Sequence, residues 1–345
     1  MPSNEALAVC QSGFEGLLVR EAALLGFEAP ESGPGWALLR RTGDAGAGTG
    51  DTLRGAAFCH AFLEAPGAVS GEKVNDLAQQ ILVLFAGGIQ GERIEARWPC
   101  VFSGGQDMTG LGRRVASVEA AFHELLGRRL GRLERLATHE TPRVGTARGL
   151  FVWFTDFGKA RVARSAHLNG PRRMADDDAA PSRSYLKVEE SYGIIGAEPC
   201  PGETVCDLGA APGGWSYSAA KRGARVVAVD NGPMKGGALG NPLIDHRLDD
   251  AFGFSPGRDA VYDWLFCDIL EDPRKVLQSI ARPWLSGGWC RRFVMNFKFG
   301  RVDPIEFLAD LRGPDSPFVK HAPGFRIVQL YHDREELTVM GMVKA

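Results

Sequence analysis

Several features that would place a chain in a membrane, outside the cell or around a metal are missing from these 345 residues. No apolar run reaches the roughly 18 residues that cross a bilayer, so no membrane span is expected. Met1 to Glu15 carries acidic side chains and lacks the basic start of a secretory signal. The seven cysteines form no C-x-x-C pair, and the seven histidines show no metal-ligand spacing. We therefore expect a cytoplasmic protein without disulfides, bound metal or membrane contact.

Charge is unevenly distributed, although the whole chain has a net charge of only −2. Between Arg113 and Arg173 there are 13 Lys/Arg and five Asp/Glu, an excess of eight positive charges. Clustered arginines bind phosphates through forked hydrogen bonds and release counterions from RNA. A solvated helix face would explain Arg128 to Arg135 equally well, but the bias of the whole segment favours an RNA-binding surface.

Apolar spacing divides the first half of the chain into two modules and a linker. Residues 1–70 form an α/β module, and residues 71–165 form a second module. Residues 166–186 are rich first in Gly, Pro and Arg and then in Asp, which predicts a linker. In the first module we expect strands at 7–10 and 58–63, a helix at 14–25 and a flexible loop at 42–50. In the second we expect helices at 74–85 and 115–136 and strands at 93–97, 150–154 and 159–163.

Strands and helices alternate in residues 187–345, which predicts a mostly parallel sheet covered on both faces. A helix at 185–191 leads into this domain. The last two strands, 325–331 and 337–343, are joined by a short link and should form an antiparallel hairpin at one sheet edge. This arrangement is typical of a methyltransferase rather than a dehydrogenase. The other expected strands end at 206, 229, 248, 266 and 297, and the other helices cover 215–222, 273–285 and 304–311.

The strand that ends at Cys206 is followed by a glycine-rich turn, Asp207 to Gly214, and then by a helix from Trp215. Glycines let the backbone approach a ligand closely, and the start of a helix offers free N–H groups. Asp230 ends the next strand, 23 residues after Asp207, close to the spacing at which a carboxylate binds a ribose hydroxyl. An ordinary glycine-rich turn is the alternative, because this is not the dinucleotide G-x-G-x-x-G pattern.

Four ionisable residues are expected at the carboxyl ends of the strands, where ligands bind in such sheets. They are Lys187, Asp268, Lys298 and Glu336. Each of them alone is most simply a surface charge or one half of an ion pair. Two lysines and two carboxylates around one cleft would form a mutually neutralising group.

The string Asp-Leu-Gly-Ala-Ala-Pro-Gly-Gly-Trp at 207–215 resembles the S-adenosylmethionine (SAM) loop of the FtsJ-like RNA ribose 2′-O-methyltransferases. The four ionisable residues match the Lys-Asp-Lys-Glu tetrad of that family. The resemblance implies a SAM-dependent enzyme that methylates a ribose 2′-hydroxyl of RNA. Such a protein must position the two reactants and remove the hydroxyl proton.

The resemblance implies a role for each member of the tetrad. Lys298 would be the base, because a lysine can accept a proton once burial or a neighbouring cation lowers its pKa. Lys187 would supply the neighbouring charge, and Asp268 and Glu336 would orient the amines and the ribose. Glu335 competes for the fourth place, but Glu336 is preferred because it stands directly before the apolar strand.

The SAM contacts implied by the resemblance lie on the glycine-rich turn and at the ends of neighbouring elements: Ser184, Ala211, Pro212, Gly213, Gly214, Asp230, Asp250 and Asp268. Asp230 would bind the ribose and Asp250 the adenine amine, while Ser184 and Asp268 would lie near the methionine end. Asp249 is interpreted as a turn cap instead.

Further strings resemble RlmM-type rRNA 2′-O-methyltransferases, which act on the large subunit in bacteria: Ser-Arg-Ser-Tyr-Leu-Lys (182–187), Val-Asp-Asn-Gly-Pro-Met (229–234), Gly-Trp-Cys-Arg (288–291) and Leu-Tyr-His-Asp-Arg-Glu-Glu (330–336). That family implies ferredoxin-like and THUMP-type RNA-binding domains before the catalytic domain, and a cytidine of the peptidyl-transferase region as target. Over 1–165 only Gly13-Phe14-Glu15 and the order of elements fit. The lysine at 298 stands in Phe-Lys-Phe-Gly where relatives carry Leu-Lys-Leu-Pro, a departure that leaves the base intact.

Other classes of function fit less well. A cytosine C5-methyltransferase needs a proline before its cysteine nucleophile, and Cys267 has none. An amino-methyltransferase would show Asp/Asn-Pro-Pro-aromatic at the same place. Methylation of another RNA, or a non-catalytic SAM- and RNA-binding role in ribosome assembly, stays open, as does the oligomeric state.

Overall fold

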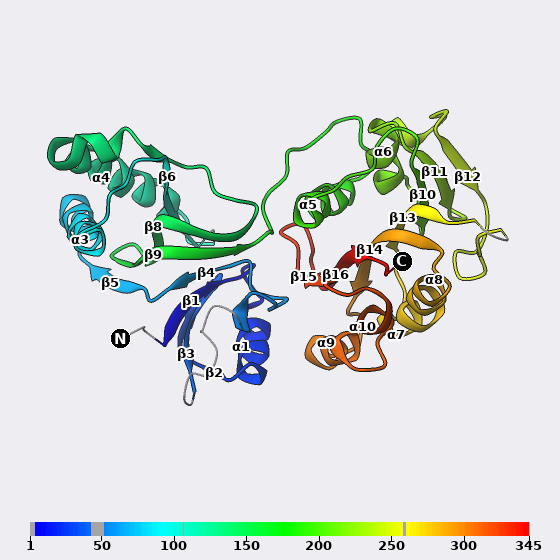
Figure 1. The fold of residues 1–345 in the computed structure, drawn as a ribbon, viewed down its shortest axis with the longest axis horizontal. Coiled ribbons are helices and arrows are strands. Elements are labelled where there is room, and N and C mark those ends of the chain that lie inside the picture. The colour runs from blue at the N-terminus through cyan, green and yellow to red at the C-terminus, as the bar shows by residue number, and fades with distance from the viewer. Residues whose placement is uncertain (1–3, 43–51, 106, 258–259, 345) are drawn as a thin grey trace. The chain divides into compact units, whose positions relative to one another are not determined.

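The computed structural model describes residues 4–42, 52–105, 107–257 and 260–344. The chain divides into two compact units, Met1–Gly170 and Pro171–Ala345, each with its own sheet (Figure 1). The loop expected at 42–50 lies, apart from Thr42, outside the described residues.

The N-terminal unit, as far as it is described, is built on one nine-stranded mixed sheet with the order β2-β3-β1-β4-β9-β8-β6-β7, and β5 also pairs with β9. Its strands are β1 (Glu5–Val9), β2 (Phe27–Gly33), β3 (Trp36–Arg41), β4 (Ala61–Glu64), β5 (Gly67–Ser70), β6 (Trp98–Gly104), β7 (Ala137–Thr138), β8 (Val144–Asp156) and β9 (Lys159–Asn169). Its helices are α1 (Glu15–Leu24), α3 (Val74–Gly88) and α4 (Leu111–Glu134). Because β4 pairs with β9, the two modules expected at 1–70 and 71–165 share this sheet.

Apolar residues at helical spacing bury one face of both α3 and α4. Leu77, Ile81 and Phe85 of α3 and Phe122 of α4 are fully buried in one core. The helix predicted over 115–136 is interrupted at Leu130, where the backbone leaves helical geometry (φ −139°, ψ 49°).

The prediction of a strand at 93–97 is wrong. The strand begins at Trp98, where the side chains become buried, whereas Arg93, Glu95 and Arg97 are exposed. Ile94 alone of this segment packs against the core, and Ala96 is exposed as well, so too little apolar surface is buried to hold a strand here.

The C-terminal unit has a seven-stranded sheet with the order β12-β11-β10-β13-β14-β16-β15. Its strands are β10 (Thr204–Leu208), β11 (Arg225–Val229), β12 (Ile244–Arg247), β13 (Tyr262–Asp268), β14 (Cys290–Lys298), β15 (Arg326–Val328) and β16 (Glu336–Met342). The first five strands in that order are parallel, and β16 is antiparallel to both β14 and β15. The predicted edge hairpin is therefore present, with β16 inserted next to β14.

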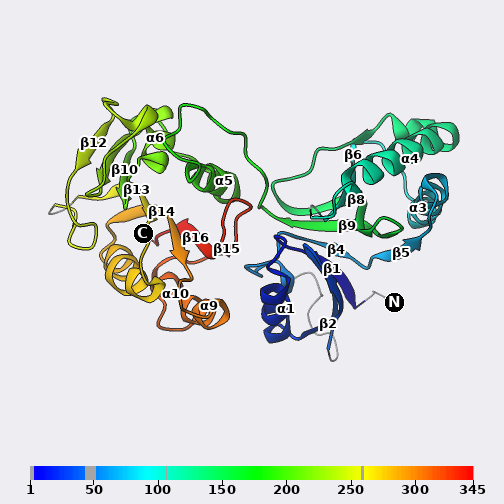
Figure 2. The same ribbon diagram turned by 180° about the vertical axis from the view of Figure 1, so that it is seen from behind.

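Helices cover both faces of this sheet, with α5 and α6 on one side and α7 to α10 on the other (Figures 1 and 2). They are α5 (Tyr185–Ile195), α6 (Gly214–Lys221), α7 (Pro273–Val276), α8 (Arg282–Ser286), α9 (Pro304–Arg312) and α10 (Pro317–His321), with a short 3-10 turn η1 (Gly236–Ala238). The helix predicted over 273–285 contains a π-helical turn, η2 (Leu277–Ala281), and α10 was not predicted.

The connection between the units is shorter than the linker predicted over 166–186, because β9 continues to Asn169 and α5 begins at Tyr185. His167 and Asn169 are buried, and His167 Nδ1 lies 2.9 Å from Thr146 Oγ1 on β8. Composition alone placed the start of the linker too early, because β9 carries these polar residues into the sheet, where Asn169 Nδ2 donates to the Cys59 carbonyl (2.8 Å).

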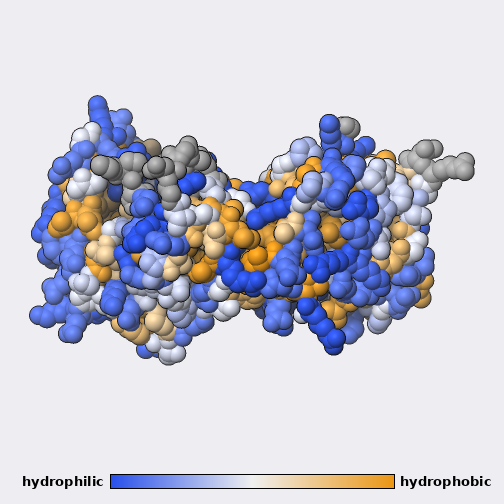
Figure 3. Space-filling model, turned by 90° about the horizontal axis from the view of Figure 1, so that it is seen from below, coloured by the Kyte–Doolittle hydropathy of each residue, from blue (hydrophilic) through white to orange (hydrophobic). Residues whose placement is uncertain are grey.

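Six of the seven cysteines are buried free thiols, and Cys200 is an exposed one. Within the described ranges no helix is both long and apolar enough to cross a bilayer. Nor do the described residues include a group of three or more His, Cys, Asp or Glu that could hold a metal ion. On the face of each unit seen in Figure 3, hydrophilic side chains are interspersed with smaller apolar patches.

Candidate active site

The glycine-rich turn leaves the carboxyl end of β10, which lies between β11 and β13 in the sheet. Gly209 and Gly213 have φ values of +76° and +104°, a region that favours glycine. A Cβ on Gly213 would lie 2.5 Å from the Cβ of Ala238, and one on Gly209 would lie 2.5 Å from Cγ1 of Ile269. Side chains are therefore excluded from this turn by both backbone conformation and space.

Asp230, which follows β11, stabilises the same turn by accepting hydrogen bonds from backbone N–H groups. Its Oδ2 accepts a hydrogen bond from the Ala211 N–H (3.0 Å), and its Oδ1 accepts one from Gly232 N–H (2.7 Å). Each carboxylate oxygen still has a second lone pair that can accept a hydroxyl. No side chain among the described residues caps α6, so the helix start beside Asp230 can receive a ligand.

Ser184 lies on the other side of the turn. Its hydroxyl is 2.8 Å from that of Ser182, and its carbonyl accepts from Trp215 Nε1 (2.8 Å). A Cβ on Gly214 would lie 2.9 Å and 3.0 Å from the hydroxyls of Ser182 and Ser184. The glycine thus keeps both hydroxyls next to the backbone at the start of α6.

Asp249 and Asp250 both follow β12 and are exposed. Asp249 Oδ1 accepts from the Asp250 N–H (2.8 Å), and Asp250 Oδ1 accepts from Phe252 N–H (3.0 Å). Asp250 therefore accepts a hydrogen bond within a turn as Asp249 does, and its contact with the adenine amine stays a prediction.

The four residues predicted at the strand ends lie together. Lys187 extends from α5, Asp268 ends β13, Lys298 ends β14 and Glu336 begins β16. Lys187 Nζ is 2.6 Å from Glu336 Oε1 and 3.7 Å from Asp268 Oδ2. Lys298 Nζ is 2.5 Å from Asp268 Oδ1 and donates to Glu336 Oε2 as well. The side chains are 6–20% exposed, so the charges interact in a partly dehydrated site.

Strand register places Glu336, not Glu335, in this cluster. Lys298 and Glu336 are direct cross-strand partners, and side chains alternate between the two faces of a strand. Glu335 is exposed, and its backbone carbonyl accepts from Phe299 N–H (2.9 Å). The pairing of β14 with β16 therefore decides between the two glutamates, which the sequence alone could not do.

The charge state of Lys298 is opposite to the one expected. Burial alone would lower the pKa of this amine, but the charges and hydrogen bonds of Asp268 and Glu336 outweigh burial and raise it. Lys298 is therefore protonated at neutral pH in this arrangement. A base at this position needs an event that weakens its contacts with the carboxylates.

Several buried polar residues around the tetrad were not predicted as site residues. Asn296 accepts from Lys298 Nζ through Oδ1 and contacts Asp333, and both are fully or almost fully buried. Asp207 accepts from Ser216 Oγ (2.6 Å), and burial raises the pKa of its carboxyl to about 7. Asn296 could have been found in the sequence, because it precedes Lys298 by two residues on a strand and so shares its face.

In the N-terminal unit, acids from outside the basic segment neutralise part of it. Glu92 pairs with both Arg148 and Arg164, and Glu31 pairs with Arg161 (2.8 Å). The excess counted along the sequence therefore overstates the positive charge at the surface. The exposed arginines of this segment include four at the carboxyl end of α4: Arg128, Arg129, Arg132 and Arg135.

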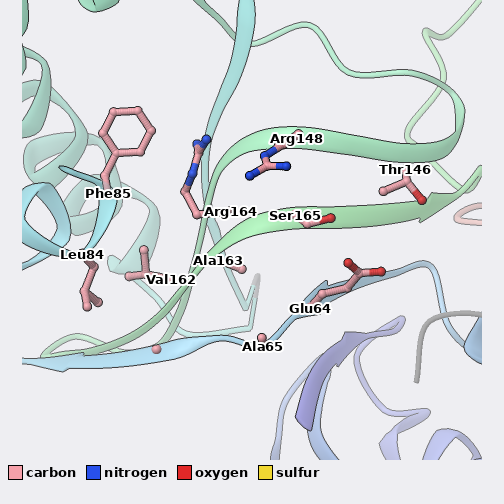
Figure 4. A pocket seen from close by; sticks show the side chains of 11 residues that line it. Glu64, Ala65, Leu84, Phe85, Thr146, Arg148, Val162, Ala163, Arg164 and Ser165 are labelled. Carbon is pink, nitrogen blue, oxygen red and sulfur yellow. The ribbon is translucent and has the colours of Figure 1, made fainter. Parts of the chain in front are cut away.

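A hollow of about 680 Å³ in the N-terminal unit contains none of the predicted site residues. Figure 4 shows Arg148 and Arg164 extending from β8 and β9, with Leu84 and Phe85 of α3 beside them. The Arg164 guanidinium stacks 5.0 Å from the centre of the Phe85 ring. Because Glu92 forms ion pairs with both arginines, we interpret them as residues that stabilise the fold.

Comparison with known families agrees with the geometry of the C-terminal unit. The model of the family "FtsJ-like methyltransferase" matches residues 180–261, which include the glycine-rich turn, Lys187 and Asp230. The turn and the sheet around it thus define an FtsJ-like methyltransferase domain.

Curated relatives identify the family more closely. Proteins named "Ribosomal RNA large subunit methyltransferase M" are 38% identical over 192 residues in Marinomonas sp. and 42% over 176 residues in Laribacter hongkongensis. The relative in Xanthomonas oryzae is 33% identical over 249 residues, 67% of this chain and 68% of that protein. This chain belongs to the family of ribosomal RNA large subunit methyltransferase M.

The matches are partial along each protein. The first two alignments span 53% and 48% of this chain, and the chain spans about half the length of those relatives, 54% and 48%. The crystal structure of TrmN from Thermus thermophilus aligns over 98% of this chain and 99% of its own, at 16% identity and a TM-score of 0.36, a likeness that supports no inference.

Proposed function

We propose that this protein is a SAM-dependent methyltransferase of large-subunit ribosomal RNA, and that it methylates a ribose 2′-oxygen. The observation that carries the proposal is the cluster of Lys187, Asp268, Lys298 and Glu336 beside the glycine-rich turn. The names of the relatives support rRNA as substrate. The finer proposal, a cytidine of the peptidyl-transferase region, rests on the resemblance seen in the sequence.

The residues around the turn suit SAM. A nucleoside needs close backbone approach and a carboxylate for its ribose, which Gly213 and Asp230 can provide. When bound, SAM supplies a methyl group on positively charged sulfur, which an oxygen nucleophile takes once its proton is removed. We assign contacts with SAM to Ser184, Ala211, Pro212, Gly213, Gly214, Asp230, Asp250 and Asp268.

Lys298 can act as the base only if one of its hydrogen bonds is released. Its ammonium has three N–H groups, and Asp268, Glu336 and Asn296 accept one each. A neutral amine would turn its lone pair toward the position of one of these acceptors. The 2′-hydroxyl proton would pass to that lone pair as the oxygen bonds to the methyl carbon, whose bond to sulfur would break and leave its electron pair on the sulfur.

Asp268 is the acceptor that we expect to yield to the ribose. Glu336 is also held by Lys187 (2.6 Å) and by the Arg334 N–H (3.1 Å). Beyond Lys298, Asp268 has a longer contact of 3.7 Å with Lys187. Displacing Asp268 would also remove a charge that raises the pKa of Lys298, which favours loss of its proton.

For the N-terminal unit we propose an RNA-binding role of the ferredoxin-like and THUMP type. In support, β3 lies between β1 and β2 and is antiparallel to both, with β4 on the other side of β1, the order of a split βαβ unit. Exposed arginines near the end of α4 could bind phosphates. Residues 1–70 and 71–165 would then present the RNA to the domain at 187–345.

The test is transfer of labelled methyl from SAM to unmodified large-subunit rRNA, comparing wild type, Lys298→Ala and Lys320→Ala. Lys320 is a half-exposed lysine of α10 and serves as the matched control. We expect label in an alkali-resistant dinucleotide with wild type and Lys320→Ala, and a loss of at least roughly 100-fold with Lys298→Ala. Binding of SAM should be nearly unchanged in all three proteins.

Four results would contradict the proposal in different parts. Label in a nucleobase would overturn ribose methylation. An active Lys298→Ala would show that Lys298 is not the general base. Binding of SAM and rRNA without transfer would favour the assembly role, and transfer only to another RNA would change the substrate.

A further inference from the structure

Asn296 is a fully buried amide that touches the amine of Lys298. It lies on the same face of β14 as Lys298, two residues earlier. In the sheet its direct partners are Asp268 on β13 and Thr338 on β16. It therefore lies in one row of the sheet with Asp268 and Thr338, next to the row that pairs Lys298 with Glu336.

The hydrogen bonds of Asn296 use both ends of its amide. Oδ1 accepts from Lys298 Nζ, while Nδ2 donates to Asp333 Oδ1 (3.1 Å) and to Thr338 Oγ1 (3.0 Å). Asp333 also accepts from the Leu330 N–H (2.9 Å) and from Thr338 Oγ1 (3.0 Å). All three members of this group are at most 1% exposed.

Only one orientation of the amide satisfies these neighbours. Turned around, Asn296 would point its N–H groups at the Lys298 ammonium, pairing donor with donor and taking away the acceptor that Oδ1 provides. A buried mismatch of that kind is costly. Asp333 and Thr338 thus keep the carbonyl of Asn296 directed at the amine.

We propose that Asn296, held by Asp333 and Thr338, is a positioning residue that fixes the amine of Lys298 for proton removal. This rests on the function proposed above. Asp268 and Glu336 attract the amine by charge, and Asp268 is the one expected to yield to the ribose, whereas Asn296 is anchored in the sheet. When Asp268 yields to the ribose, Asn296 and Glu336 would keep the amine in place.

A neutral acceptor suits this position because it directs the amine without adding a third negative charge. The charged groups that face Lys298 are Asp268 on β13, Glu336 on β16 and Lys187 on α5, and Asp333 lies behind Asn296. Removing the amide oxygen takes away one acceptor of the ammonium, which favours the neutral amine. The rate should therefore depend on pH in a way that reports this contact.

The experiment measures methyl transfer by Asn296→Ala, Thr338→Val and Thr338→Ser beside wild type, over a range of pH. Thr338→Val keeps the shape of the side chain but removes one of the two acceptors of Asn296 Nδ2, and Thr338→Ser retains the hydroxyl. We expect kcat to fall roughly 100-fold in Asn296→Ala and less in Thr338→Val, with KM for RNA and SAM binding almost unchanged. Thr338→Ser should keep most of the activity.

The pH profile separates positioning from folding. Activity should rise with pH as the base loses its proton, and in Asn296→Ala this rise should begin at lower pH. A variant that is merely less stable would show a lower melting temperature and an unshifted profile. Thr338→Val, which leaves no cavity of its own, gives the same test if Asn296→Ala does not fold.

The proposal is overturned if wild type is active and both Asn296→Ala and Thr338→Val retain its kcat and pH profile. It is also overturned if Thr338→Ser loses as much activity as Thr338→Val. An inactive wild type beside intact SAM binding would instead contradict the proposed function itself.

Discussion

At the residue scale, the protonation of single buried groups follows from what surrounds them. The pKa of Lys298 is raised because its two carboxylate partners outweigh the effect of burial. The pKa of Asp207 is raised because burial outweighs the hydrogen bond from Ser216. The Oδ1 atom of Asp207 is buried and has no hydrogen-bond partner among the described residues. Neighbouring carboxylates thus favour a charged lysine at 298, whereas burial favours a neutral aspartic acid at 207.

Asp207→Asn tests this account through stability. The carboxyl has an ordinary pKa of 3.8 and a folded pKa of about 7, so the folded state binds the extra proton between these values. Stability is therefore lost as pH rises through that window, by roughly 4 kcal/mol at most. Asp207→Asn stays neutral and should lack this loss, as measured by denaturant unfolding at pH 4, 5.5 and 7.

Asp263, on β13 in the same sheet, provides a control of opposite sign. Burial would raise the pKa of this carboxyl, but hydrogen bonds from Thr204 and Arg291 lower it. Asp263→Asn should therefore destabilise the protein at neutral pH and matter less in acid. Equal pH dependence of unfolding in wild type and Asp207→Asn would show that Asp207 is ionised when folded.

At the scale of elements, the turn between β10 and α6 can form only where its glycines carry no side chain. Gly213→Ala would combine a φ of +104° with a Cβ placed 2.5 Å from Ala238 and 2.9 Å from the sulfur of Met234. The turn must shift, so we expect SAM affinity to fall at least tenfold, because the backbone no longer meets the ligand. Isothermal titration of SAM measures the change.

Gly202 is the matched control for this substitution. Its φ is +91°, but nothing lies within 4 Å of the position that a Cβ would occupy. Gly202→Ala should carry only the backbone strain, on the order of 1 kcal/mol in unfolding, with SAM affinity unchanged. If both variants bind SAM as wild type does, the turn does not form the cofactor site.

At the scale of the whole molecule, the proposed function assigns a different task to each unit. The C-terminal unit contains all the residues proposed for SAM and for proton removal, while the exposed arginines of α4 belong to the N-terminal unit. Ion pairs with Glu31 and Glu92 take several other arginines out of consideration. RNA affinity and methyl transfer should therefore respond to different substitutions.

Neutralising Arg128, Arg132 and Arg135 together, each to Gln, should weaken rRNA binding and leave SAM binding unchanged. If all three contact phosphates, the slope of log affinity against log salt should decrease by about two to three. Filter binding at several salt concentrations measures it. The charge-matched control neutralises Arg225, Arg274 and Lys320 on the C-terminal unit, and an equal loss in both variants would refute a specific role for α4.

The sequence by itself determined the features that depend on local pattern. Alternation of strands and helices predicted the C-terminal sheet, and the glycine-rich turn and the polar residues at strand ends predicted the site, because parallel strands bring their carboxyl ends to one edge. Period-three to period-four spacing likewise located α3 and α4.

Only the tertiary structure decided which partners those residues have. Register between β14 and β16 selected Glu336 over Glu335 and brought Thr338 to Asn296. Packing set the protonation of Lys298, and Glu92, far away in sequence, neutralised Arg148 and Arg164. Hydrogen bonds and ion pairs depend on distances of a few ångströms across the fold, which the order of residues along one chain does not contain.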